Sequence, residues 1–168
     1  MKPDIVIIGT GHRLQAGHPE YSVDQHKRYR ELLERTRKKY RIKLIAEEMS
    51  ADVLSDYGTT ETNGQQVATS KGIQHHFIDL TAKERSQFGI DRFSLHQTGQ
   101  SAKLSAPQFA ALERFTGELR ECLWLTRVLT INIWPTLFVC GANHGPRVEH
   151  LFNCVGKLAI LEVNDYEP

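Results

Sequence analysis

Five short apolar runs, separated by longer stretches of helical periodicity, constrain the fold of this chain more than any other feature. The runs lie at about residues 4–9, 42–47, 73–79, 136–141 and 158–163. They are close to continuous rather than alternating, which is typical of parallel strands covered on both faces. The alternation of strand and helix therefore predicts an α/β fold, an open, mostly parallel five-stranded sheet with helices on both faces.

Four intervening segments have the pattern of helices, at 23–40, 62–71, 105–131 and 146–155. Ser22 is a suitable N-cap for the first, and Gly156 is suited to end the last. Residues 81–104 form the irregular part of the chain, since they are polar and include two glycines. Long loops in compact domains are often lids over binding sites. Two interpretations stay open for this stretch, a lid loop and a disordered surface loop.

Size and composition indicate one soluble domain over 1–168. The 168 residues can bury a core, and the net charge of +1 gives no general attraction to nucleic acid or acidic membranes. No apolar run reaches the roughly 18 to 20 residues that span a bilayer, and the amino terminus lacks the shape of a secretory leader. Cys122, Cys140 and Cys154 form no Cys-x-x-Cys pair, which favours buried, reduced thiols. We expect a cytoplasmic protein without nucleic-acid or membrane partners, whether monomer or homodimer.

Two copies of a Gly-x-x-His motif each follow a predicted strand. The first occupies residues 9–12 and ends at His12; the second occupies residues 141–144 and ends at His144. Glycine lets the backbone turn sharply and approach a ligand closely. Since ligands bind beyond the carboxyl ends of the strands in open α/β sheets, we expect both imidazoles in one crevice at that edge.

Acidic residues end two other predicted strands at the same edge. Glu47 and Glu48 end the second strand, and Asp79 ends the third. Consecutive strand residues point to opposite faces, so one glutamate is expected in the crevice, and the sequence leaves open which one. His75 and His76 precede the strand end and are expected in the core or in a supporting role.

Two histidines and a glutamate suit two chemistries. They can bind a divalent metal such as Mn, Zn or Co, or they can act directly as base and acid. Arginines would stabilise developing negative charge, and an aromatic ring beside arginine suits an anionic or planar substrate. The candidate catalytic residues are His12, Glu47, Glu48, His144 and Arg120. The candidate metal ligands are His12, Glu47 and His144, and the candidate substrate-binding residues are Arg13, Asp79, Arg85 and Trp124.

Two further patterns raise nucleotide or nucleic-acid binding. Gly9 and Gly11 resemble part of a dinucleotide-binding turn, but Leu14 stands where a third glycine is needed and no helix is expected at once. Residues 27–43 contain nine lysines and arginines. Acidic residues interrupt this stretch and no aromatic platform accompanies it, so a solvated helix face is the favoured interpretation.

The histidine motifs and the strand-end glutamate resemble those of the TraB/PrgY/TIKI group and its relatives, the erythromycin-esterase-like and ChaN-like proteins. The resemblance rests on residues 7–12, 44–47 and 139–144. It implies an α/β domain with its site at the carboxyl edge of the sheet. Members include metal-dependent peptidases, esterases that need no metal, and an iron/haem-binding protein. An arginine shortly after the glutamate is common in the TraB branch and is absent from 49–52 here, although Arg85 or Arg120 could replace it in space.

These observations predict a small soluble hydrolase, with or without a metal, that acts on an ester, peptide or phosphoester. Its partner would be a small-molecule or peptide substrate. Two alternatives stay open: a non-catalytic module that binds a metal or haem in the same crevice, and a nucleotide-binding protein.

Overall fold

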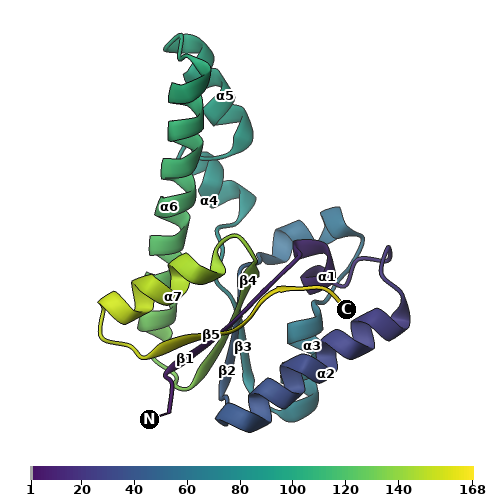
Figure 1. Ribbon diagram of the computed structural model, residues 1–168. Coiled ribbons are helices and arrows are strands. Elements are labelled where there is room, and N and C mark those ends of the chain that lie inside the picture. Colours follow the sequence, from purple (N-terminus) through teal and green to yellow (C-terminus); the bar gives the residue numbers. More distant parts are fainter. Residues whose placement is uncertain (1) are drawn as a thin grey trace.

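The structure is a computed structural model that describes residues 2–168, apart from the side chains of 92–94 and 101. It contains a five-stranded sheet, wholly parallel, with the strand order β3-β2-β4-β1-β5 (Figure 1). The strands are β1 Ile5–Thr10, β2 Leu44–Glu47, β3 Gln74–Phe77, β4 Thr136–Gly141 and β5 Ala159–Tyr166. The predicted α/β fold with an open parallel sheet is confirmed.

Helices cover both faces of this sheet. They are α1 His12–Ala16, α2 Val23–Tyr40, the 3-10 helix η1 Ala51–Tyr57, α3 Asn63–Lys71, α4 Ala82–Gln87, α5 Arg92–Ser101, α6 Ala106–Ile131 and α7 Gly145–Cys154. The four helices expected from sequence match α2, α3, α6 and α7 to within one residue at either end. Helix α1 begins directly after β1, so the expectation that no helix follows the first glycine motif at once is wrong.

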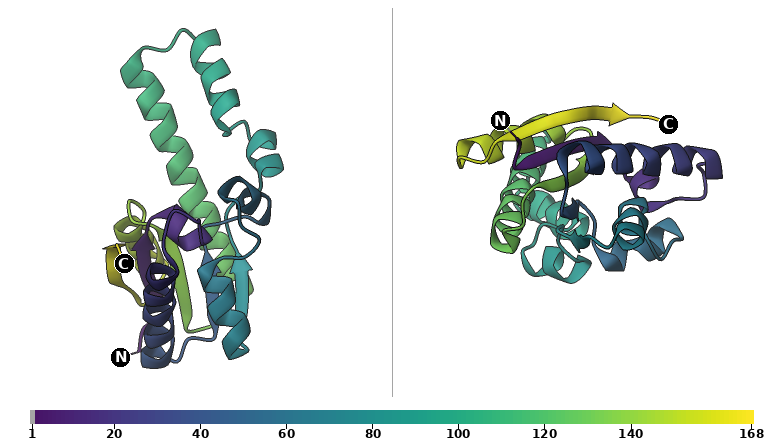
Figure 2. Two further views of the ribbon diagram at one scale, coloured as in Figure 1. Left: turned by 90° about the vertical axis from the view of Figure 1, so that its right-hand side faces the viewer. Right: turned by 90° about the horizontal axis from the view of Figure 1, so that it is seen from below.

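The stretch interpreted as an irregular loop, 81–104, is mostly helical. Thr81 caps α4 through a reciprocal pair of hydrogen bonds with Glu84, and α5 follows. Helix α5 and the outer half of α6 project from the body as a two-helix arm (Figures 1 and 2). The arm projects because α6 has 26 residues. At about 1.5 Å per residue, this helix is longer than the sheet that it covers. A lid role for this stretch stays a prediction.

Two apolar layers sandwich the sheet, and alternate strand residues belong to each. Val6 and Ile45 pack beneath α2, in the layer that includes the fully buried Tyr29. Ile7 and Ala46 belong to the other layer, which α6 and α7 cover. Since side chains alternate along a strand, the residue after Ala46 returns to the α2 face and the next one to the α6 face.

The strand order places the two histidine motifs side by side. Strand β4 lies between β1 and β2, with Thr10 paired to Gly141 and Glu47 paired to Val139. The carboxyl ends of these three strands therefore meet at one point of the sheet edge.

Two expectations about the chain as a whole are tested by the same fold. Within residues 2–168 no helix combines the length and apolar character needed to cross a membrane. The three cysteines are unpaired, but only Cys140 is buried, whereas Cys122 and Cys154 are exposed. The expectation that all three are buried is therefore wrong, because the latter two lie on outward-facing sides of α6 and α7.

Candidate functional site

Glu48 is the centre of the cluster at the sheet edge. It directly follows β2, is 2% exposed, and donates its backbone N–H to Val139 at 2.8 Å. Its Oε1 lies 3.3 Å from His12 Nε2 and 3.7 Å from His144 Nε2. Its Oε2 accepts a hydrogen bond from the Gly141 backbone N–H at 2.8 Å. The structure thus brings both predicted histidines to one carboxylate.

Glu47 lies on the opposite face of the sheet. It is fully buried, accepts a hydrogen bond from Thr62 Oγ1, and pairs with His75 Nε2 at 2.6 Å. Gly64 leaves room for this carboxylate, since a Cβ there would lie 2.6 Å from Glu47 Oε1. The expectation that Glu47 joins His12 and His144 is therefore wrong, because strand alternation turns it toward α3. Glu48 takes that place.

The two adjacent histidines of β3 differ in the same way. His75 is half-buried and supports Glu47, which agrees with the supporting role expected for it. His76 is exposed, so neither a core nor a supporting role at the site fits it.

His12 begins α1 and reaches Glu48 across Gly141. A Cβ at Gly141 would lie 3.0 Å from His12 Nε2, so this glycine permits the close approach. The His12 side chain is 41% exposed. The hydrogen bond to Glu48 raises the pKa of His12 above its usual value, although burial of part of the ring opposes the shift.

His144 is held by a residue that sequence reasoning missed. Its Nδ1 lies 2.6 Å from Oε1 of Glu121, a 4% exposed residue of α6, and Arg147 Nε pairs with the other oxygen of Glu121 at 2.8 Å. The Trp124 ring packs edge-on against the imidazole, with ring centroids 5.1 Å apart. Glu121 precedes Trp124 by three positions, on the same buried helix face. An acidic residue on the apolar face of a predicted helix was the feature of the sequence that could have indicated Glu121.

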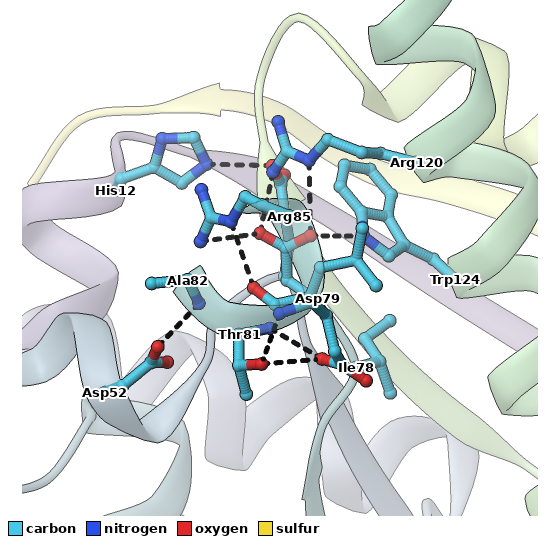
Figure 3. A network of polar contacts seen from close by, with 12 residues as sticks. His12, Asp52, Ile78, Asp79, Thr81, Ala82, Arg85, Arg120 and Trp124 are labelled. Carbon is cyan, nitrogen blue, oxygen red and sulfur yellow. Dashed lines mark hydrogen bonds and ion pairs between the residues drawn. The ribbon is translucent and has the colours of Figure 1, made fainter. Parts of the chain in front are cut away.

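Arg120 links Glu48 to Asp79. Its Nη2 lies 3.1 Å from Glu48 Oε1 and 2.7 Å from Asp79 Oδ2. Trp124 Nε1 donates to Asp79 Oδ1 at 2.9 Å, and Arg85 Nη2 lies 3.6 Å from Oδ2 (Figure 3). Burial alone would raise the pKa of Asp79, but the hydrogen bond and charge of Arg120 outweigh burial and lower it.

A cavity of about 170 Å³ opens beside these groups. His12, Glu48, Asp79, Arg85 and Arg120 all line it, so it joins five of the candidate residues at one polar surface.

Four candidates do not line this cavity: Glu47 and His144, described above, and Arg13 and Trp124. Arg13 is exposed and pairs with Glu20 at 2.5 Å, away from Glu48. Trp124 is fully buried and contacts the site only through Asp79, His144 and the guanidinium of Arg120. The structure therefore gives Trp124 a packing role instead of the expected substrate contact, because its face of α6 turns toward the sheet.

The donors nearest to a metal-binding set are His12 Nε2, His144 Nε2 and Glu48 Oε1. In the part of the chain that the structure describes, no three His, Cys, Asp or Glu side chains are arranged to hold an ion. The Arg120 guanidinium, 3.1 Å from Glu48 Oε1, competes with a cation for that oxygen. The arrangement as it stands does not fit a resident metal, and the expected divalent cation stays a prediction.

No family model, curated protein or solved structure matches this chain. The resemblance to the TraB group thus stays a prediction, and function has to be argued from the site itself.

Proposed function

We propose that the protein is a hydrolase in which His12 activates water at the edge of the sheet. The observation that carries this proposal is the convergence of His12, His144 and Arg120 on the buried carboxylate of Glu48, beside an open cavity. A histidine oriented by a buried carboxylate and accessible to solvent is the arrangement that general-base catalysis requires. The bond broken would be an ester, peptide or phosphoester bond.

Proton positions follow from the partners of each ring. An ionised carboxylate only accepts hydrogen bonds, so His12 Nε2 donates to Glu48 and His12 Nδ1 is left to accept a proton from water. In Figure 3 the dashed contact of His12 starts from one ring nitrogen, and no contact is drawn from the other. The oxygen of that water would then bond to the carbonyl carbon or phosphorus of the substrate.

Arg120 and Arg85 would stabilise the negative charge that develops on the substrate oxygen. Both guanidinium groups line the cavity, and a fixed cation at such a position favours the transition state over the ground state. His144 would be the acid in its protonated form, in which Nδ1–H donates to Glu121 and Nε2–H faces the site and passes its proton to the leaving group. The proton taken up by His12 then leaves to solvent, and His144 regains one from solvent. Apart from water and the substrate, all the reacting groups in this mechanism are side chains of the protein.

The test is hydrolysis of a panel of p-nitrophenyl esters, peptides and phosphoesters by the wild type and by His12→Ala and His144→Ala. We expect each substitution to lower kcat by about 100-fold or more, the usual contribution of a general base or acid. His76→Ala is the matched control, because this histidine is exposed and outside the site. Equal activity of folded wild-type and His12→Ala protein on every active substrate would refute the proposal.

A chelation experiment separates the metal-free mechanism from a metal-dependent one. If His12 is the base, protein treated with EDTA keeps its activity. Activity that is lost with EDTA and restored by Mn²⁺, Zn²⁺ or Co²⁺ would instead assign the water-activating role to a cation.

A further inference from the structure

A second hollow continues from the site toward the helical arm. Its volume is about 580 Å³, and it shares Val53, Arg85 and Arg120 with the smaller cavity of about 170 Å³. This volume is typical of small-molecule sites, at roughly 300 to 1,000 Å³. We call it the arm groove. A substrate whose reacting group lies beside Glu48 would therefore have an adjoining hollow for the rest of its chain.

One part of the wall of the arm groove is apolar and has room for a ligand. Ile90, Leu95 and Phe109 line it and are each half-buried. Gly117 of α6 also lines it, and a Cβ added there would meet no atom within 4 Å. Half-exposed apolar side chains around open space favour an aliphatic or aromatic chain, because covering them removes apolar surface from water.

Acidic side chains also line the groove. Asp56, Asp91 and Glu113 line it, whereas the two arginines shared with the site both face Asp79. Asp56 and Glu113 are exposed, and neither forms an ion pair with a basic side chain among those described. A cationic group on the ligand would therefore be attracted to Asp56 and Glu113.

We propose that the arm groove binds the elongated part of the substrate, an aliphatic chain that ends in an ammonium group. The substrate class is an ester or amide of an ω-amino acid or of lysine, with its carbonyl at Glu48 and its ammonium group near Asp56 and Glu113. This assignment of substrate class rests on the proposed hydrolase function, whereas binding in the groove can be measured without turnover.

The binding test compares ε-aminocaproamide with caproamide, which differ only by the ammonium group. Amide NMR signals of the full chain report both ends, with Gly117 in the groove and Gly141 at the site. We expect both signals to move, and the ammonium compound to bind about fivefold more tightly, as one partly exposed ion pair provides. Asp56→Asn combined with Glu113→Gln removes this preference, and the control Glu31→Gln on α2 keeps it.

A second pair of variants tests the space itself. Gly117→Leu, whose Cβ would meet no atom within 4 Å, places a large side chain in the groove and weakens binding of both amides at least fivefold, while Gly117→Ala keeps binding. Equal binding of both amides by the wild type, or unchanged binding in Gly117→Leu, would overturn the groove.

The two proposals fail separately. Groove binding without hydrolysis of p-nitrophenyl ε-aminocaproate or of any ester, peptide or phosphoester in the panel would refute the hydrolase and leave the groove. Hydrolysis of p-nitrophenyl acetate together with no binding of either amide would refute the groove and leave the hydrolase.

Discussion

Replacing Arg120 by methionine removes the only positive charge that contacts both Glu48 and Asp79 among the described residues. Those carboxylates are 2% and 5% exposed, and the guanidinium pairs with them at 3.1 and 2.7 Å. Breaking a buried ion pair typically costs about 3 to 5 kcal/mol, because the remaining charge stays buried without compensation. The Arg120 side chain is 23% exposed beside a cavity, so water that enters its place would reduce this free-energy cost. We therefore expect a loss of about 2 to 4 kcal/mol.

The assay is urea unfolding followed by circular dichroism at pH 7, with Asp79→Asn and the double variant completing a mutant cycle. Asparagine can still accept the hydrogen bond from Trp124 Nε1. Without Arg120, the charge of Asp79 is compensated only in part by Arg85, 3.6 Å from its Oδ2. Removing that charge should therefore make the double variant more stable than Arg120→Met alone, with a coupling energy of about 1 to 3 kcal/mol. For a chain of this size the single loss corresponds to a fall in Tm of roughly 5 to 15 °C.

The pH dependence of this difference has a defined sign. Arg120 lowers the pKa of Asp79 in the folded state, so the stabilisation is present above the unfolded pKa of about 3.9 and is lost as the pH falls through the folded value. The difference between wild type and Arg120→Met should thus narrow on acidification. A loss under about 1 kcal/mol at neutral pH, or a difference that does not narrow, would refute the ion-pair reasoning.

Three further outcomes are expected. Glu48 raises the pKa of His12. NMR titration of the ring should therefore give a pKa above 6.5 in the wild type and a lower pKa in Glu48→Gln. The contribution of His12 to stability is full below about pH 6.5 and is lost as the pH rises through the pKa of the folded state. Hydrolysis should increase over that same upper range, where His12 becomes neutral, and a rise centred below 6.5 would contradict the base assignment. Gly141→Ala places a Cβ 3.0 Å from Nε2 of the half-exposed His12 ring, so activity should fall while the free energy of unfolding changes by no more than about 1 kcal/mol. Gly64→Ala, with its Cβ 2.6 Å from the buried Glu47 carboxylate, should instead lower that free energy by about 1 to 3 kcal/mol, and unchanged urea unfolding would show that Glu47 can move aside.

The sheet could be predicted because its signal is local. Each buried strand is a short apolar run, and each long helix carries a cap or stop residue, so Val23–Tyr40 was located to the residue. The arm was missed for a related reason. Helix α4 has no buried side chain, and among the described residues of α5 only Gly99 is buried, so neither segment shows the apolar stripe that identifies a helix packed on a core.

The histidines could be predicted more completely than the acids. His12 and His144 follow apolar strands at the same spacing from a glycine, which indicated one sheet edge. For Glu47 and Glu48, strand alternation predicts only that the two side chains point to opposite faces of the sheet. Which one meets the histidines depends on which face α6 covers, and that is a long-range packing decision.

By itself the sequence determined the strands, their parallel direction and the presence of two histidines at their carboxyl ends, because hydrophobic periodicity and glycine turns act between near neighbours. Only the tertiary structure decided that β4 inserts between β1 and β2, that Glu48 faces α6, and that Arg120 and Glu121 complete the cluster. Those contacts join residues 23 to 93 positions apart, and a buried charge finds its partner only when distant elements pack together.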